Sequence, residues 1–239
     1  MHGGGFRIAP ADFAIPMTHP NPASLIDHTL LKPDTRADQV RRLCEEAVEH
    51  GFASVCIPPV YVPLAADLLY GSEVAVGTVI GFPLGYSATA VKVLETAEAV
   101  AAGAVEIDMV IPVGNALDGE LAVVEEEIRQ VVGAAGAARV KVILECCFLP
   151  TACKIALTEA VVRAGAAYVK TSTGFGPGGA TIADVELLAR IAAGRIGVKA
   201  AGGIRDWGTC RALLAAGATR IGSSAGTAIV DEWRREQGL

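Results

Sequence analysis

The sequence lacks any apolar run long enough to cross a bilayer, and it does not begin with a basic segment followed by an apolar one. We therefore expect neither a membrane span nor a secretory signal. Basic blocks are also missing, because 20 Lys and Arg stand against 26 Asp and Glu, for a net charge of −6. This balance disfavours nucleic acid and anionic membranes as partners. An anionic ligand would have to be bound by local donors.

Cysteine patterns that indicate zinc are absent as well. The six cysteines show no C-x-x-C spacing and have no histidine nearby. Several lie within apolar runs, which is typical of buried free thiols. We expect no metal site, and a reducing cytoplasm is the simplest compartment.

The chain does contain a regular alternation of short β-branched runs and Ala- and Leu-rich segments of helical length. The expected strands are residues 24–31, 53–57, 74–82, 105–111, 140–148, 167–172, 196–202 and 219–224. The expected helices are residues 36–50, 60–70, 88–102, 119–135, 151–164, 181–193, 206–216 and 224–236. Eight βα units in 239 residues predict a closed (β/α)8 TIM barrel. The alternative is a doubly wound open sheet, which the lack of an opening G-x-G-x-x-G motif disfavours.

The barrel is expected to occupy residues 24–239 as a single domain. Residues 1–23 are rich in Gly, Pro and Asn and are expected to form a loosely ordered arm. Gly51, Gly103, Gly165 and Gly217 each follow an expected helix. Glycine at that position can adopt the left-handed conformation that turns the chain into the next strand.

Three of the six lysines lie within expected strands, and they are evenly spaced. The separation is 29 residues both from Lys141 to Lys170 and from Lys170 to Lys199, which is one βα unit. Lys141 precedes its apolar residues and is expected lower in the barrel. Lys170 and Lys199 follow theirs, so we expect both near the C-terminal ends of strands, where such barrels place their active sites.

Two ammonium groups on adjacent strands would repel each other. At a separation of about 5 Å and an effective dielectric of about 20 the repulsion is roughly 3 kcal/mol, or somewhat over two pKa units. Lys170 could then be a neutral amine able to form a Schiff base with a carbonyl. The alternative is that Lys170 and Lys199 pair with carboxylates and have only a structural role. The pairing of the two lysines favours catalysis, because perturbed titrating pairs cluster at functional sites.

Asp108 lies inside the apolar run 105–111, on the same strand face as Glu106. A carboxylate close to two lysines can orient water or transfer protons. It can equally be a plain ion-pair partner, and the residues alone leave both interpretations open.

The loops after the last two expected strands, "KAAGGIRDW" and "IGSSAGT", occupy the usual phosphate site of such barrels. Gly202 and Gly203 allow close backbone approach. Ser223 and Ser224 add hydroxyl groups at the start of a helix, whose N–H groups bind anions. Together the two loops predict a phosphorylated ligand.

From about Ser24 to Ala228 these residues resemble the 2-deoxyribose-5-phosphate aldolases, a family of class I aldolases. The motifs "IDHTLLKPDT", "VCIPPVYV", "VGTVIGFPLG", "EIDMVIPVG", "VKTSTGFG", "VKAAGGIRD" and "RIGSSAG" follow the family's order. The resemblance implies reversible cleavage of 2-deoxy-D-ribose 5-phosphate into acetaldehyde and D-glyceraldehyde 3-phosphate, in deoxyribonucleotide catabolism. It implies a phosphosugar as the partner and no metal or organic cofactor, and it allows a homodimer.

The resemblance also implies roles for individual residues. Lys170 would be the Schiff-base lysine, Lys199 its charged neighbour and proton-relay partner, and Asp108 the acid/base. The substrate-binding positions would be Asp27, Thr29, Cys56, Thr171, Gly202, Gly203, Gly222, Ser223 and Ser224. The chain departs from the pattern at Ala225, where some members carry a serine.

Two other functions stay open at this point. A phosphosugar isomerase or epimerase on the same barrel would need carboxylate or histidine bases in place of a nucleophilic lysine. His28 is the only histidine in an expected strand, and a structural role is the safer interpretation for it. A non-catalytic phosphosugar-binding barrel is disfavoured by the joint presence of Lys170, Lys199 and Asp108.

Overall fold

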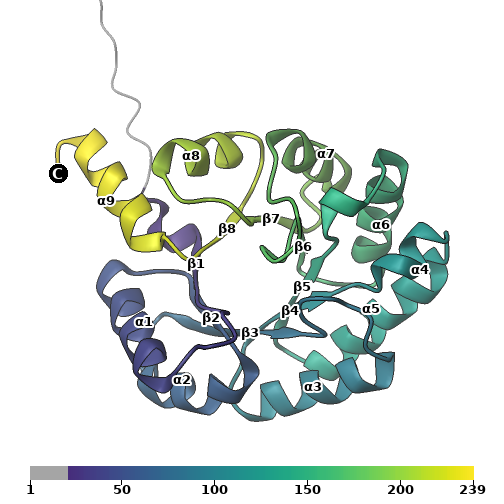
Figure 1. The fold of residues 1–239 in the computed structure, drawn as a ribbon, viewed down its shortest axis with the longest axis horizontal. Helices are drawn as coiled ribbons and strands as arrows, with labels where there is room; N and C mark the ends of the chain where they lie inside the picture. Colours follow the sequence, from purple (N-terminus) through teal and green to yellow (C-terminus); the bar gives the residue numbers. More distant parts are fainter. Residues whose placement is uncertain (1–20) are drawn as a thin grey trace, which may run out of the picture.

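The computed structural model describes residues 21–239 and contains eight parallel strands closed into a barrel (Figure 1). The strands are β1 (Ile26–Thr29), β2 (Ser54–Ile57), β3 (Ala75–Ile80), β4 (Glu106–Val110), β5 (Arg139–Ile143), β6 (Tyr168–Lys170), β7 (Gly197–Ala201) and β8 (Arg220–Ser223). Each strand pairs with the next in sequence, and β8 pairs with β1. The predicted TIM barrel is confirmed.

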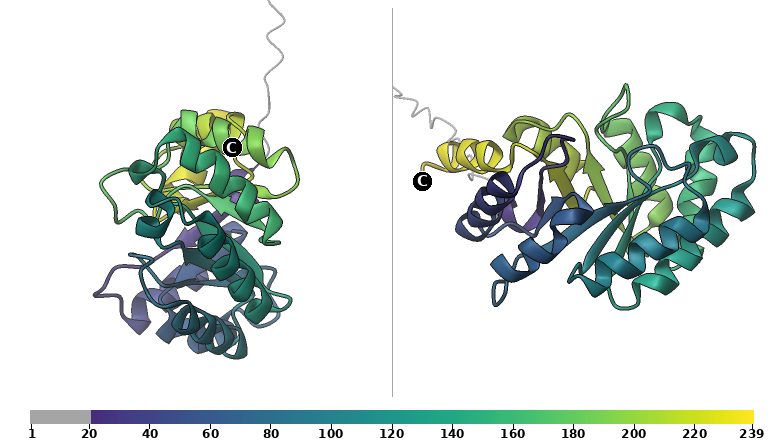
Figure 2. Two further views of the ribbon diagram at one scale, coloured as in Figure 1. Left: turned by 90° about the vertical axis from the view of Figure 1, so that its right-hand side faces the viewer. Right: turned by 60° about the horizontal axis from the view of Figure 1, so that its bottom comes forward.

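Helices surround the barrel and cover the outer faces of its strands (Figures 1 and 2). They are α1 (Ala37–His50), α2 (Val62–Leu68), α3 (Thr89–Ala101), α4 (Val113–Leu117), α5 (Leu121–Ala135), α6 (Thr151–Arg163), α7 (Ile182–Ala192), α8 (Trp207–Ala215) and α9 (Gly226–Gln237). Short 3-10 helices are η1 (Pro22–Leu25), η2 (Pro59–Tyr61) and η3 (Cys146–Phe148). No helix among residues 21–239 is long and apolar enough to cross a membrane.

The elements differ from the expected ones at three places. Helix α4 was not expected, because five residues are too few to show a helical period in the sequence. The strand expected over 140–148 ends at Ile143, and Cys146–Phe148 forms η3 instead. At the third place, η1 begins at Pro22, within the range expected as an arm, and Ala23 is buried in the core. The rest of that arm, residues 1–20, lies outside the described part of the chain.

The glycines that follow helices have the expected backbone conformation. The φ angles are +70° at Gly51, +108° at Gly103, +81° at Gly165 and +107° at Gly217. At Gly217 a side chain is also excluded sterically, because a Cβ there would lie 2.7 Å from that of Ala189. These four glycines explain how α1, α3, α6 and α8 turn back toward the barrel.

Alternation along the strands separates an apolar outer layer from a polar interior. On β4, Ile107 and Met109 belong to the buried hydrophobic cluster between strands and helices. Glu106 and Asp108 alternate with them and therefore point into the barrel, where both are buried. The helices thus pack on an apolar surface while the barrel axis is available for charged groups.

Candidate active site

Two lysines and an aspartate from β4, β6 and β7 meet inside the barrel, with Lys170 at the C-terminal end of its strand. Lys170 ends β6 and lies directly beside Lys199 of β7 in the parallel register. The Nζ atoms of both lysines donate to the same oxygen, Oδ2 of Asp108, at 2.6 Å each. The two nitrogens therefore lie no farther apart than twice that distance, as the even spacing of the lysines in the sequence predicts.

A second layer of buried charges lies beneath this group. Lys141 Nζ is 2.6 Å from Glu106 Oε2, 3.0 Å from Asp108 Oδ1 and 3.2 Å from Asp27 Oδ2. Arg220 donates to Asp27 Oδ1 at 2.6 Å and reaches Glu106 Oε2 at 3.3 Å. Lys141 thus lies lower in the barrel than the other two strand lysines, as expected from its place before the apolar residues.

Among the described residues, the buried members of this cluster include one more cation than carboxylates; the exposed Arg139 also approaches Glu106 Oε1, at 3.6 Å. Its cations are Lys141, Lys170, Lys199 and Arg220, and its carboxylates are Asp27, Glu106 and Asp108. Lys141 contacts all three carboxylates, and Lys199 contacts Asp108 and, at 2.5 Å, Asp27. Lys170 contacts Asp108 alone. Its positive charge is therefore the least compensated.

The pKa shifts follow this difference. Burial lowers the pKa of Lys170, Lys199 lowers it further, and Asp108 only partly opposes them. Burial also disfavours the charge of Lys199, but Asp108 and Asp27 outweigh it and raise the pKa of Lys199. Burial works against the charge of Asp108 too, yet the three lysines hold its pKa well below the usual range. Removal from water, more than the repulsion expected from the sequence, favours a neutral Lys170 beside a charged Lys199.

An open cavity of about 320 Å³ gives access to Lys170. Of the predicted residues, it is lined by Thr29, Lys170, Gly202, Gly203, Gly222, Ser223 and Ser224. It is also lined by residues that sequence reasoning missed, namely Leu30, Leu31, Lys32, Thr173, Gly174, Phe175, Ala201, Ile204 and Arg205. All nine belong to motifs recognised in the sequence, and six of them lie within five residues of Lys170 or of the Gly202 and Gly203 pair, which is the signal that could have identified them.

Three predicted substrate-binding residues do not line this cavity. Asp27 lies in the lower layer of ion pairs. Cys56 is buried, and burial together with the charge of Asp108 raises the pKa of its thiol to about 11. The hydroxyl of Thr171 exchanges hydrogen bonds with the backbone of Ala201, so it ties β6 to β7.

The two predicted phosphate loops differ in what their helices can offer an anion. Asp206 caps α8 by accepting from Thr209 N at 2.7 Å, so its own carboxylate occupies that helix end. Helix α9 has no side-chain cap at its N-terminus. Ser223 Oγ accepts from Ala225 N and donates to Ile204 O, which joins the two loops. The free N–H groups at the start of α9 are therefore the better anion site.

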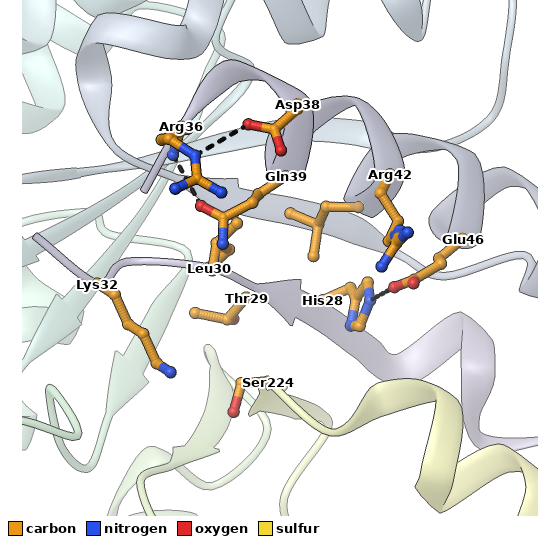
Figure 3. Close-up of a pocket in the computed structure, with 11 residues that line it drawn as sticks. His28, Thr29, Leu30, Lys32, Arg36, Asp38, Gln39, Arg42, Glu46 and Ser224 are labelled. Carbon is orange, nitrogen blue, oxygen red and sulfur yellow. Dashed lines mark hydrogen bonds and ion pairs between the residues drawn. The ribbon is translucent and has the colours of Figure 1, made fainter. Parts of the chain in front are cut away.

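A second cavity of about 580 Å³ lies between the end of β1, helix α1 and Ser224 (Figure 3). It shares Thr29, Leu30, Lys32 and Ser224 with the first cavity. His28 is buried at its edge, with Nε2 2.8 Å from Glu46 Oε2 and its ring 4.7 Å from that of Phe52. These contacts join β1 to its surroundings and agree with the structural role expected for His28.

Residues 21–239 contain neither a clustered metal-ligand set nor a disulfide. No group of three or more His, Cys, Asp or Glu side chains there is arranged to hold a metal ion. The six cysteines are all unpaired, and only Cys147 is exposed.

The chain folds into a closed (β/α)8 barrel. Inside it, the amine of Lys170, whose pKa is lowered, lies beside the charged amine of Lys199. This arrangement defines a barrel enzyme whose candidate nucleophile is a lysine. Residues 23–231 match the family model described as DeoC/LacD family aldolase. The chain belongs to this family of aldolases, and it is an enzyme of the lyase class.

Individual relatives agree with the family match. A deoxyribose-phosphate aldolase of Syntrophotalea carbinolica is 56% identical over 219 residues, covering 92% of this chain and 99% of the relative. One of Caldanaerobacter subterraneus is 51% identical over 222 residues, covering 92% and 96%. A solved tetrameric deoxyribose phosphate aldolase of Aeropyrum pernix is 36% identical with a TM-score of 0.83, covering 89% of this chain and 90% of that one.

Proposed function

We propose that this protein reversibly cleaves 2-deoxy-D-ribose 5-phosphate into acetaldehyde and D-glyceraldehyde 3-phosphate through a Schiff base on Lys170. The observation that carries the proposal is the amine of Lys170, which is buried, faces the cavity and has a lowered pKa. The relatives named above as deoxyribose-phosphate aldolases supply the substrate.

The bond changes follow from the chemistry of an amine and an aldehyde. The neutral Lys170 amine adds to C1 of the open-chain sugar, and loss of water gives an iminium ion. As the 3-hydroxyl group loses its proton, the C2–C3 bond breaks and its electrons move into the iminium, which releases D-glyceraldehyde 3-phosphate. The remaining enamine takes a proton on carbon, and water then frees acetaldehyde and Lys170. The iminium nitrogen accepts the electrons, so the reaction requires no metal or organic cofactor.

Asp108 is the group best placed to transfer protons in these steps. Its Oδ2 atom is 2.6 Å from the Nζ of Lys170 and of Lys199. It can therefore accept a proton from the carbinolamine and pass one back through Lys199. Lys199 stays charged, because it also contacts Asp27, and it keeps the reacting nitrogen next to a positive charge.

We assign the phosphate group to the end of the same cavity that Gly202 and Gly203 line. The backbone N–H groups at Gly202, Gly203 and the start of α9 can donate to it. Lys32 and Arg205 line the cavity as well and supply positive charge in an otherwise acidic chain.

Trapping the Schiff base tests the proposal. Acetaldehyde with borohydride should irreversibly modify Lys170 and abolish activity, and Lys170→Met should abolish both labelling and turnover. Lys154→Met is a matched control, because Lys154 pairs with Asp184 outside the barrel. A label on Lys199 instead would reverse the roles of the two lysines. Cleavage of the sugar phosphate without any label would refute the Schiff base.

We further infer a cytoplasmic location, which the six unpaired cysteines support. A homodimer is the assembly we propose, although the Aeropyrum pernix relative is a tetramer. Light scattering of the purified protein measures the assembly directly.

A further inference from the structure

Glu145, just beyond the end of β5, is a buried carboxylate in a backbone conformation that usually requires glycine. Its side chain is 3% exposed, its backbone is left-handed with φ +56°, and it is not glycine. Residues other than glycine rarely adopt this conformation, and they keep it only where the surroundings enforce it. No ion pair involves Glu145 among the described residues, so this buried carboxylate depends on hydrogen bonds.

The left-handed backbone turns the side chain of Glu145 toward the segment that follows Lys170. On one side of it, Leu144 N donates to Lys170 O at 3.0 Å, and on the other, Cys146 N donates to Thr171 O at 2.9 Å. The ladder to β6 therefore continues past Glu145 on both sides. The conformation lets one residue leave the ladder without breaking it.

The carboxylate of Glu145 holds Thr173 through both its backbone and its side chain. Thr173 N donates to Oε1 at 3.2 Å and to Oε2 at 3.3 Å, and Thr173 Oγ1 donates to Oε2. The same hydroxyl accepts from Phe175 N at 3.0 Å. Gly174, with φ +85°, lies between these two residues, so its peptide groups are fixed from both sides.

The rest of this loop folds closely over the carboxyl group and onto the glycine pair that follows β7. A Cβ on Gly176 would lie 3.2 Å from Glu145 Cδ. A Cβ on Gly179 would lie 2.3 Å from Gly202 O, and Ala180 N donates to the same oxygen. The segment 173–180 is thus held by Glu145 on one side and by the backbone of Gly202 on the other.

This loop forms one wall of the cavity above Lys170. Thr173, Gly174 and Phe175 line it together with Gly202 and Ser224. We propose that Glu145 is a positioning residue that sets this wall, and with it the binding of the phosphate end of the substrate. The inference rests on the proposed function, because it assigns the phosphate to this end of the cavity.

Glu145→Gln is the informative change, because an amide has one acceptor oxygen where the carboxylate has two. The loss of affinity should therefore be largest for substrates that contact the segment 173–180. We expect KM for 2-deoxyribose 5-phosphate to rise about tenfold. Turnover of unphosphorylated 2-deoxyribose and acetaldehyde trapping on Lys170 should change less than twofold. Glu186→Gln removes the same charge from an exposed position of α7 and should leave both substrates unaffected.

A second pair of variants tests the same link if Glu145→Gln does not fold. Thr173→Val removes the hydroxyl that connects Glu145 to Phe175 N, and Thr173→Ser retains it. Valine should lower the preference for the phosphorylated substrate, and serine should restore it relative to valine. In the double variant of Glu145→Gln and Thr173→Val, the losses should be less than additive.

Two kinetic results would overturn the inference. One is an equal loss on both substrates, which leaves the ratio of their kcat/KM values unchanged, and the other is fully additive losses in the double variant. Calorimetric binding of D-glyceraldehyde 3-phosphate separates this inference from the proposed function. If the unmodified protein neither labels at Lys170 nor cleaves the sugar phosphate, the proposed function fails. A weaker affinity of Glu145→Gln for D-glyceraldehyde 3-phosphate would still support the positioning role, and an equal affinity would refute it.

Discussion

Lys199→Met should raise the pKa of Lys170 and move the pH profile for imine formation to higher pH. The change removes one of four buried cations, and the remaining three then balance the three carboxylates. Lys170 can become fully charged in that balanced cluster. Asp108, freed from Lys199, also becomes a stronger partner for Lys170.

The contact distances set the size of the shift. Both amines lie 2.6 Å from Asp108 Oδ2, so their nitrogens are at most twice that distance apart. Two unit charges about 5 Å apart at an effective dielectric of about 20 repel by roughly 3 kcal/mol, which corresponds to about two pKa units. Desolvation of Lys170 remains in the variant, so the expected shift is the removed repulsion, about two pKa units. Below the new pKa the amine is protonated, and imine formation should fall there.

The assay is borohydride trapping with acetaldehyde at a series of pH values, with the labelled peptide identified by mass spectrometry. Trapping reports the free amine directly, whereas turnover also contains the proton-transfer steps in which Lys199 takes part. Lys154→Met provides the control for loss of a lysine outside the cluster. An unchanged profile, or one moved to lower pH, would show that Lys199 does not depress the pKa of Lys170.

Three further changes test other parts of the reasoning. Asp108→Asn should slow turnover more than trapping and shift the trapping profile to lower pH, opposite to Lys199→Met; an alkaline shift would contradict it. Ser224→Asp should raise KM strongly for the sugar phosphate while sparing free deoxyribose, and equal losses on both would show that the phosphate lies elsewhere. Lys92→Met leaves buried Glu127 without its cation and should cost about 3–5 kcal/mol in denaturant unfolding; a loss below about 1 kcal/mol would mean that the pair is not needed.

Local patterns in the sequence determined most of the fold. Alternating runs and helical segments predicted the eight strands, and the strand boundaries differ from the observed ones by a few residues. The spacing of 29 residues placed Lys170 beside Lys199 because parallel neighbours in a barrel share one register. Helix α4 was not predicted, because five residues are too few to show a helical period.

Tertiary structure alone decided which charges compensate one another. Asp27 and Arg220 are 193 residues apart in the chain, and no local pattern indicates that they meet beneath the two lysines. Burial is a property of the closed barrel, so the larger cause of the lowered Lys170 pKa could not be predicted from strand spacing. Glu145 lies inside the run 140–148 that was expected to form a strand, and only the folded chain turns it toward Thr173. Period and spacing are local properties, so the sequence by itself determined which strands carry the polar residues of the site. Solvent exclusion and counter-charges depend on segments that only folding brings together, so the tertiary structure decided them.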